Sequence, residues 1–438
     1  MKLPESVERC ICRLEDAGFA AYAVGGCVRD ALLGIEPHDY DLCTAASPEQ
    51  TQAVFENEKL VLAGVKHGTV GIVTSTGVVE ITTFRTEGGY ADARHPDWVK
   101  FVDRVEADLA RRDFTVNAMA WSPTRGLADP FGGRKDLEAG VLRAVGDPQT
   151  RFREDALRIL RGVRFAVRFG LTVEPKTESA MFRLAPLMEK LARERVFEEL
   201  CKLLPLVTAA DLLHFAPVLT AVIPELAPMV GFDQHSPHHA FDIYTHTAYV
   251  VENTPPSLHL RWAALLHDTG KVPTFTRDET GRGHFYGHAK ESAAIADTVL
   301  RRLKAPTELR EQATTLIGLH MTRLEPEKKV IRRWLGRLGP ETTEDLLTFQ
   351  KADMVSKGVG KESEMAQHLR LRCLVAEVQA EASCLSLRDL AVNGNDLIAL
   401  GYEGKAIGEC LARLLDAVLD ERLPNDRDVL LAEAKTMR

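Results

Sequence analysis

The sequence predicts an α+β protein in which a small head with a mixed sheet precedes a long, all-helical body. Runs rich in β-branched and apolar residues are concentrated before about residue 85, with helical patterns between them. From about residue 150 onward, apolar residues recur at helical spacing with Arg, Glu and Lys on the polar side. At 438 residues and 45% hydrophobic composition, the chain is long enough for several domains with buried cores.

The head elements follow from local patterns and are bounded by glycines. We expect, in order, a helix at 5–17, a buried strand at 20–24, a Gly-Gly turn, a short helix at 28–33, and strands at 38–43, 68–74 and 78–84. In the body, the clearest helical periodicities cover 152–169, 177–204 and 405–419.

Composition and charge exclude several classes of protein. The eight cysteines are scattered without a Cys-x-x-Cys pair, which argues against a disulfide scaffold or zinc finger and favours a reducing compartment. No run approaches the roughly 18 apolar residues that span a bilayer, so we expect a cytoplasmic protein without a membrane partner. A net charge of −8 argues against a uniformly basic coat for nucleic acid.

A possible phosphate site and a possible metal site follow one another in the head. The Gly25-Gly26 turn lies between an expected strand and helix, where backbone N–H groups could receive a triphosphate, and Arg29 adds positive charge. Asp39 and Asp41 would leave the same face of one strand, close enough to share metal ions. Taken alone, each feature is more often a simple turn or a solvated pair. Their order and spacing are what nucleotidyl transfer requires.

Five ordered motifs carry a resemblance to a known family. They are Val24-Gly25-Gly26-Cys27-Val28-Arg29-Asp30, Asp39-Tyr40-Asp41-Leu42, Glu80 to Arg85, Arg111 to Ala118, and Glu154 to Arg158. Together they resemble the class II tRNA nucleotidyltransferase (CCA-adding) and bacterial poly(A) polymerase family of the DNA polymerase β superfamily. The resemblance implies a polymerase-β-like nucleotidyltransferase head in which Asp39 and Asp41 bind Mg²⁺, assisted by Glu80.

The resemblance also implies how nucleotides are held and chosen. It assigns phosphate and ribose contacts to Arg112, Asp113 and Asn117, and base selection to Asp155 and Arg158. On one predicted helix, Asp155 and Arg158 would offer an acceptor beside a donor, which matches cytosine and adenine but not guanine or uracil. An intrahelical salt bridge is the alternative.

Positive charge is concentrated near these motifs. Residues 104–168 contain 13 Lys and Arg against 9 Asp and Glu, and Arg158, Arg161, Arg164 and Arg168 repeat at helical spacing. Such a stripe suits contacts to nucleotide or RNA phosphates, although a solvated helix face is equally compatible with it.

Three segments favour CCA addition over poly(A) synthesis within the family. Residues 66–70 resemble CCA-adding members, residues 87–96 resemble the flexible loop needed for adding A, and residues 394–415 resemble the tail of CCA-adding enzymes. We therefore expect tRNA, CTP and ATP as partners. The alternatives are a poly(A) polymerase, an HD phosphohydrolase with an RNA-binding head, and a non-catalytic RNA-binding protein. The sequence sets no expectation for the oligomeric state.

Nine of the 14 histidines lie between His235 and His320. His246, His267-Asp268 and Asp353 follow the order of the HD phosphohydrolase superfamily, and such ligands could hold a divalent transition metal. His288 and His320 could bind a second metal or a phosphate, whereas His238 and His239 are expected at the surface or outside the ligand set. Any single histidine is more often structural.

These signals divide the chain into four expected domains. They are a nucleotidyltransferase head at 1–145, a helical RNA-binding neck at 146–232, an HD domain at 233–355 and a tRNA-binding helical tail at 356–438.

Overall fold

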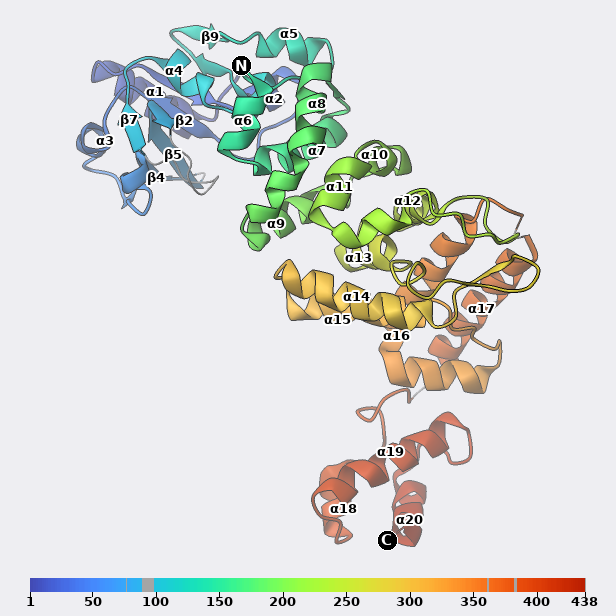
Figure 1. The fold of residues 1–438 in the computed structure, drawn as a ribbon. Coiled ribbons are helices and arrows are strands. Elements are labelled where there is room, and N and C mark those ends of the chain that lie inside the picture. The colour runs from blue at the N-terminus through green and yellow to red at the C-terminus, as the bar shows by residue number, and fades with distance from the viewer. Residues whose placement is uncertain (76, 89–97, 361, 382–383, 438) are drawn as a thin grey trace. The chain divides into compact units, whose positions relative to one another are not determined.

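The computed structural model describes residues 1–438 apart from 76, 89–97, 361, 382–383 and 438. The chain forms two compact units, one of residues 1–206 and 214–224 and the other of residues 207–213 and 225–438. A sheet in the head and helices along the rest confirm the α+β prediction (Figure 1). All eight cysteines are free thiols. Within the described residues, no helix is both long and apolar enough to cross a membrane.

The head is built on a seven-stranded mixed sheet with the order β3-β4-β5-β2-β1-β8-β9. Its strands are β1 (Ala21–Val24), β2 (Asp41–Thr44), β3 (Leu60–Val61), β4 (Thr69–Thr74), β5 (Gly77–Thr83), β8 (Ala120–Ser122) and β9 (Gly126–Ala128). β2 and β5 run parallel, and the other neighbours are antiparallel. β3, β8 and β9 were not predicted because two or three residues are too few to show an alternating pattern.

Short helices and a separate hairpin complete the head. The helices are α1 (Glu5–Asp16), α2 (Gly26–Leu32), α3 (Pro48–Val54), α4 (Val105–Ala110) and α5 (Gly133–Glu138), with 3₁₀ turns η1 (Val65–His67) and η2 (Thr115–Asn117). β6 (Arg85–Gly88) pairs with β7 (Trp98–Phe101) outside the main sheet. Tyr22, Phe84 and Leu109 lie at the centre of the head core. Gly133 permits α5 to approach η2, because a Cβ there would lie 2.1 Å from the carbonyl oxygen of Thr115.

The prediction of one continuous helix over 152–169 is wrong. The chain forms α6 (Pro148–Glu154) and α7 (Leu157–Phe169), and Asp155 between them has extended backbone angles (φ −144°, ψ 104°). The Asp155 carboxylate accepts the backbone N–H of Leu157 at 3.0 Å, an Asp side-chain contact that competes with helix continuation. Apolar periodicity continues across the break and therefore hides it.

The predicted helix at 177–204 is also divided. It consists of α8 (Pro175–Leu184), the 3₁₀ segment η3 (Ala185–Lys190) and α9 (Arg193–Leu203). Pro186 has no backbone N–H and cannot continue α8. The short parallel pair β10 (Val141–Leu142) and β11 (Thr172–Val173) packs beside α7. The region predicted as the neck also contains α10 (Ala209–His214), α11 (Ala216–Val222) and η4 (Pro224–Met229), and its residues 207–213 and 225–232 belong to the second unit.

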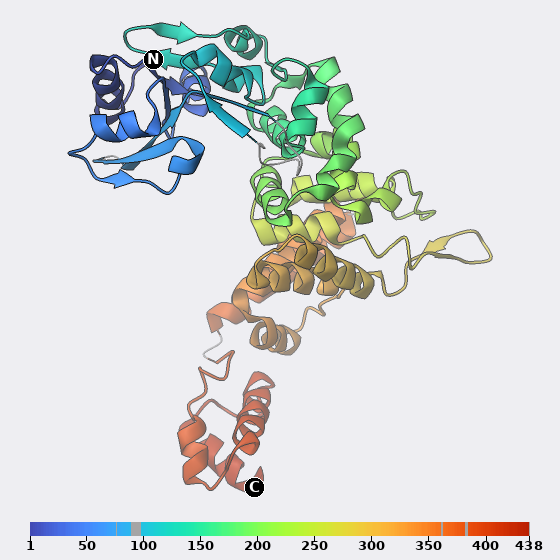
Figure 2. The same cartoon turned by 60° about the vertical axis from the view of Figure 1, so that its left-hand side comes forward.

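Among its described residues, the second unit has helices and one small hairpin, β12 (Thr276–Arg277) and β13 (Gly283–His284), which stands away from the helices in Figure 2. Its helices are α12 (Ile243–Asn253), α13 (Leu258–Leu266), α14 (His288–Arg302), α15 (Thr307–Leu319), α16 (Lys328–Val355), α17 (Glu362–Glu381), α18 (Gly394–Ala399), α19 (Lys405–Leu419) and α20 (Arg427–Met437). α19 confirms the prediction at 405–419. α16 bends at Gly339 (φ +79°), directly before Pro340.

A buried carboxylate joins the head to the neck within the first unit. Asp113 accepts hydrogen bonds from its neighbour's backbone N–H (Phe114, 2.8 Å), from Asn117 (3.1 Å) and from Arg161 of α7 (3.0 and 2.8 Å). Burial alone would raise the pKa of Asp113, but the Arg161 charge and the hydrogen bonds lower it to about 2.

Asp113 is therefore expected to stabilise the fold in a pH-dependent manner. Because its folded pKa lies below the ordinary value of 3.8, the stabilisation is present above about pH 4 and is lost as the pH falls toward 2. Asp113→Asn should lower the free energy of unfolding by about 2 kcal/mol at pH 7. Urea titrations followed by tryptophan fluorescence should show this difference constant from pH 7 to 5 and narrowing below pH 4.

The matched control is Asp16→Asn, which changes an exposed carboxylate and should leave stability within about 0.5 kcal/mol of the wild type. A difference between wild type and Asp113→Asn that widens as the pH falls would contradict the assignment.

Candidate functional site

Two carboxylate residues are register partners on the parallel strands β2 and β5 of the head. The register places Asp41 of β2 directly opposite Glu80 of β5, and both residues are exposed. The expectation that Glu80 lies on a neighbouring strand is therefore met by the fold. Asp39 is exposed as well but precedes the strand, contrary to the prediction of a strand over 38–43.

Sheet pairing explains why the strand begins at Asp41. On one side, pairing with β1 ends at Ala23 opposite Leu42, and on the other side pairing with β5 begins at Asp41. Asp39 thus has no ladder partner, and its side chain is positioned by the connecting segment.

The charge at Asp41 depends on its neighbours. Partial desolvation raises the pKa of the Asp41 carboxyl; Arg112 opposes this, and repulsion from Glu80 and Asp39 adds to it. A cluster of like charges with oxygen donors facing solvent fits a hard divalent cation, which would relieve the repulsion. The three carboxylates thus suit metal binding by their chemistry.

The glycine turn brings Arg112 to the start of α2. Gly25 has φ +78°, which favours glycine, and a Cβ at this position would lie 2.6 Å from Nη1 of Arg112. Arg112 also lies 3.7 Å from the Asp108 carboxylate. Gly26 at the start of α2 and Arg112 therefore form one surface of backbone and guanidinium donors, as nucleotide phosphates require, whereas the Gly25 N–H is bonded to the carbonyl oxygen of Met119 at 3.0 Å.

Arg29 takes a different place from the one expected. Its guanidinium is buried, donates to Asp30 (2.8 and 2.6 Å) and to Asn117 Oδ1 (2.5 Å), and lies 4.3 Å from the ring centre of Phe169. Since these partners occupy its donors, Arg29 fixes Asn117 and α2 rather than presenting a free charge to a triphosphate.

Asp155 and Arg158 do not lie on one helix, contrary to expectation. The Asp155 carboxylate receives Arg195 Nη2 of α9 at 2.8 Å, whereas Arg158 donates to Glu154 at 2.7 Å and to the carbonyl oxygen of Arg111 at 3.1 Å. The backbone break after α6 turns the two side chains to different partners. Arg195, which holds Asp155, carries no motif signal that would have identified it from the sequence.

The expected arginine stripe is partly buried in ion pairs. Arg161 binds Asp113, and Arg164 is buried against Glu199 at 2.5 Å. The four arginines do repeat along α7 at helical spacing. Arg164, however, joins α7 to α9 through Glu199 and is too buried to bind phosphates.

A second cluster forms in the other unit from widely separated histidines. Two sets of ligand atoms in the described chain lie within 4.8 Å of one another, namely His246, His267 and Asp268, and Asp268, His288 and His320, all buried. Asp353 joins them, with Oδ1 at 3.0 Å from His246 Nε2 and 3.9 Å from His267 Nε2. The structure thus brings together all four residues that the sequence singled out.

The donor atoms of this cluster fit a metal ion. His267 Nε2 is buried and makes no well-aligned hydrogen bond among the described residues, although it lies 3.2 Å from Asp268 Oδ2. Two potential ligand atoms this close to one another are suited to sharing a cation. Burial alone would lower the pKa of His267, but Asp268 and Asp353 raise it, while both carboxyls have pKa values well below the ordinary one. Burial lowers the pKa of His320 to about 3, so it is a neutral donor.

Three further residues surround the cluster. Lys271 Nζ lies 2.8 Å from Asp268 Oδ2, and Lys357 Nζ lies 3.0 Å from Asp353 Oδ2. The ring of His239 packs edge-on against His246 with 5.2 Å between ring centres, and burial lowers its pKa to about 2. His238 is exposed, as expected, whereas His239 contacts the cluster directly.

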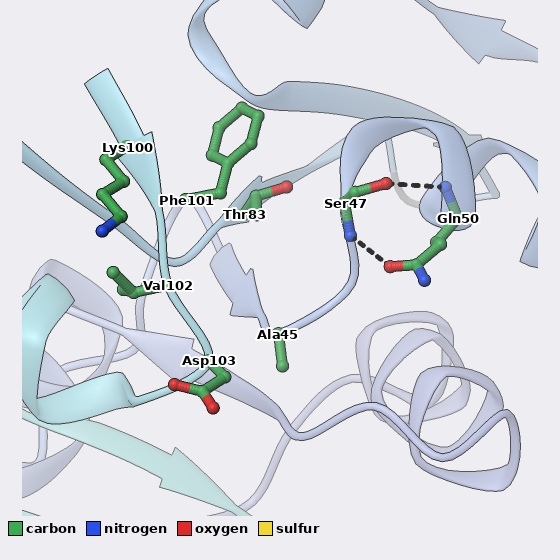
Figure 3. Close-up of a pocket in the computed structure, with 8 residues that line it drawn as sticks. All are labelled: Ala45, Ser47, Gln50, Thr83, Lys100, Phe101, Val102 and Asp103. Carbon is green, nitrogen blue, oxygen red and sulfur yellow. Dashed lines mark hydrogen bonds between the residues drawn. The ribbon is translucent and has the colours of Figure 1, made fainter. Parts of the chain in front are cut away.

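A shallow pocket in the head lies where the parallel strands β2 and β5 end, away from Asp41 and Glu80. Ala45, Thr83 and Lys100 are among its lining residues, and Ser47 and Gln50 cap each other beside it (Figure 3). Asp41 and Glu80 do not line it, so this hollow is distinct from the carboxylate site. Most of the predicted loop at 87–96 lies outside the described residues.

Three family descriptions match parts of the chain. Residues 21–143 match the Poly A polymerase head domain, residues 170–229 match a probable RNA and SrmB-binding site of polymerase A, and residues 284–434 match a putative tRNA nucleotidyltransferase domain 2. These ranges cover the carboxylate site, part of the neck and most of the second unit.

Similar proteins extend over nearly the whole chain. The CCA-adding enzyme of Streptococcus pneumoniae (strain CGSP14) is 33% identical over 96% of this chain and 94% of its own length. That of Streptococcus thermophilus (strain CNRZ 1066) is 32% identical over 100% and 98%. The solved structure of the Bacillus stearothermophilus CCA-adding enzyme in complex with CTP has a TM-score of 0.73 and 30% identity, covering 100% of this chain and 98% of that one.

Members of this family use divalent metal ions, consistent with the carboxylates at Asp41 and Glu80. The sequence motifs, the parallel pairing of the two carboxylate strands and the full-length similarity agree with one another. The chain belongs to the CCA-adding enzymes, a family of tRNA nucleotidyltransferases.

Proposed function

We propose that this protein adds C, C and A to the 3′ end of tRNA from CTP and ATP without a nucleic-acid template. The observation that carries the proposal is the opposition of Asp41 and Glu80 beside the Gly25 turn and Arg112, in a chain 33% identical to a CCA-adding enzyme over 96% of its length. The four expected domains, and a cytoplasmic setting suited to eight free thiols, belong to the same proposal.

The proposed reaction is attack by the tRNA 3′-hydroxyl on the α-phosphate of the nucleotide, with release of pyrophosphate. Mg²⁺ ions held by Asp39 and Asp41, with Glu80 beside them, would neutralise charge on the attacking and leaving oxygens. Arg112 and the backbone N–H groups at the start of α2, from Gly26 onward, would hold the triphosphate, and Gly25 would form the turn that lets them approach it. Asn117, fixed by Arg29 and Asp113, would contact the ribose.

Base choice is proposed to depend on Asp155 and Arg158, with Arg158 exchanging Glu154 for the base while Arg195 stays bound to Asp155. Each is held by an ion pair, Asp155 with Arg195 and Arg158 with Glu154. Cytosine and adenine both present an amino donor beside a ring acceptor, which a carboxylate and a guanidinium can satisfy together. We propose that Arg195 keeps the Asp155 carboxylate oriented for this contact.

Asp41→Asn should reduce nucleotide incorporation by at least about a thousandfold, because it removes a charged metal ligand. The assay uses purified protein, tRNA lacking its CCA end, Mg²⁺, and CTP and ATP supplied singly and together, with products resolved on sequencing gels. The wild type should add C, C and A and then stop.

Asp16→Asn is the control because it changes an exposed carboxylate in α1. Long A tails on unrelated RNA would instead indicate a poly(A) polymerase. Full activity of Asp41→Asn would show that nucleotide transfer does not depend on the carboxylates at Asp41 and Glu80.

Arg195→Ala should weaken base selection rather than triphosphate binding. Loss of one oriented hydrogen bond costs about 1 kcal/mol or more, so the preference for CTP over UTP should fall roughly fivefold to tenfold, with little change in KM for CTP. Asp155→Ala should lower the preference for CTP over UTP further. Single-turnover incorporation of CTP and of UTP by each variant measures this preference and the KM for CTP.

The matched control is Arg193→Ala on the same helix, whose side chain donates to the carbonyl oxygen of Glu189. Equal losses of selectivity in the two arginine variants would contradict a specific role for Arg195.

We propose a second activity, metal-dependent phosphoester hydrolysis, at the histidine cluster. It is favoured by the proximity of His246, His267, Asp268 and Asp353 to one another, and by the burial of their ligand atoms. A divalent transition metal held there would activate water for attack on a phosphoester. Neutral His288 and His320 would position the phosphate or a second metal.

His267→Ala should abolish hydrolysis of a 2′,3′-cyclic nucleotide while CCA addition continues. Activity should require Ni²⁺, Co²⁺ or Mn²⁺ and be lost on chelation. His259→Ala is the control, since that histidine binds Asp345 at 2.8 Å outside the cluster. Hydrolysis that survives in His267→Ala would exclude this site.

A further inference from the structure

The β12–β13 hairpin is attached directly to the histidine cluster. Gly283 N donates to the carbonyl oxygen of His235 at 2.9 Å, and a Cβ at Gly283 would lie only 2.3 Å from the carbonyl oxygen of Gln234. Gln234 Oε1 accepts from Lys271 Nζ at 2.8 Å, and Lys271 contacts Asp268. The base of the hairpin is thus held against a residue of the metal-binding set.

A second connection runs through the segment after β13. The carbonyl oxygen of Phe285 contacts His288 Nδ1 at 2.8 Å, and the Phe285 ring lies 5.4 Å from Lys271 Nζ. Tyr286 is two residues before His288, a separation that spans at most about 7 Å between Cα atoms. Tyr286 therefore stands at the edge of the cluster.

Tyr286 is a rigidly supported and exposed aromatic ring. It is 78% exposed, yet it stacks on His284 with 5.3 Å between ring centres and 6° between planes. His284 Nε2 is in turn held by Asp278 Oδ2 at 2.8 Å. An exposed ring fixed in this way offers a platform on which a nucleobase can stack.

Two exposed arginines of the hairpin have histidine partners in place of carboxylates. Arg282 Nη2 lies 2.8 Å from His238 Nε2, and Arg277 contacts His235. Neither arginine forms an ion pair within the described part of the chain. The Asp278 carboxylate accepts the N–H groups of Thr280 and Arg282 inside the turn.

Asp278 and Glu279 equal the two guanidinium groups of the hairpin in number, but neither carboxylate forms an ion pair with Arg277 or Arg282 within the described residues. Glu279 is exposed at the turn, and Asp233 lies 3.3 Å from His235. Guanidinium groups without a carboxylate partner are suited to binding phosphates.

We propose that Arg277, Arg282 and Tyr286 form a docking rim that presents the end of a single-stranded RNA to the histidine cluster. Arg277 and Arg282 bind backbone phosphates, and a base near the end stacks on Tyr286. The inference rests on the proposed phosphohydrolase activity and specifies its substrate class as an RNA end rather than a free nucleotide. An acidic peptide would use the arginines but neither the stacked ring nor the adjacent phosphoester chemistry.

The rim is tested by comparing two substrates in the full-length protein. One is an RNA of about eight nucleotides ending in a 2′,3′-cyclic phosphate, and the other is the corresponding cyclic mononucleotide. Tyr286→Ala and the double variant Arg277→Gln/Arg282→Gln should each raise KM for the RNA about tenfold, with KM for the mononucleotide and kcat nearly unchanged. The double variant should also reduce the salt slope of log KM by about 1.4.

Two matched variants keep the interpretation specific. Tyr286→Phe retains the stacked ring and loses only the contact of the hydroxyl with His284 Nδ1 at 3.3 Å, so it should raise KM for the RNA far less than Tyr286→Ala does. Arg301→Gln removes an exposed arginine of α14 that is paired with Asp297. An unchanged KM for the RNA in both rim variants would contradict the proposed rim. Equal increases in KM for the RNA and for the mononucleotide would contradict it as well.

A binding measurement separates failure of the rim from failure of the hydrolytic activity. The same RNA with 4-thiouridine at its 3′-terminal position is photocrosslinked to His267→Ala protein, and the modified peptides are identified by mass spectrometry. Crosslinks in 276–286 that disappear in Tyr286→Ala support the rim even if no hydrolysis is found. Crosslinks confined to other segments overturn it even if hydrolysis occurs.

Discussion

The charge of Asp113 constrains the architecture of the first unit. A carboxylate removed from water destabilises a fold unless its oxygens accept hydrogen bonds, and Asp113 meets this requirement with its neighbour's backbone, Asn117 and Arg161. Asn117 in turn holds Arg29, which fixes α2 behind the glycine turn. The turn, the 3₁₀ segment η2 and the neck helix α7 are therefore positioned by one connected set of charges.

The second unit also buries carboxylates, but it compensates their charges with a different set of groups. Its cluster gathers two buried carboxylates and several imidazoles, and Lys271 and Lys357 balance the carboxylates from outside. His267 Nε2 lies 3.2 Å from Asp268 Oδ2 without a well-aligned hydrogen bond, so these ligand atoms remain suited to binding a cation. The two sites thus differ in ligand type: exposed oxygens suited to Mg²⁺ in the head, and buried nitrogen and oxygen donors in the second unit.

Much of this organisation was predictable because it rests on local patterns. The glycine turn and the carboxylates at Asp41 and Glu80 follow from motifs in short stretches. The four residues of the histidine cluster lie far apart in the chain, and it is their order that resembles a known superfamily. What could not be predicted depends on distant partners. Apolar periodicity runs unbroken across Asp155, whose carboxylate is held by the nearby Leu157 N–H and by Arg195, 40 residues later. Likewise, the burial of Arg164 depends on Glu199.

The sequence separation within the histidine cluster has a consequence for biosynthesis. His246 and Asp353 are 107 residues apart, and Asp353 lies near the end of α16. Domains fold largely in the order in which they leave the ribosome. The nucleotide-binding unit, whose last segment ends at residue 224, is complete well before the cluster can close. His246 and His267 therefore emerge before their last carboxylate partner, and the nascent chain passes through a stage with a finished polymerase head and an open metal site.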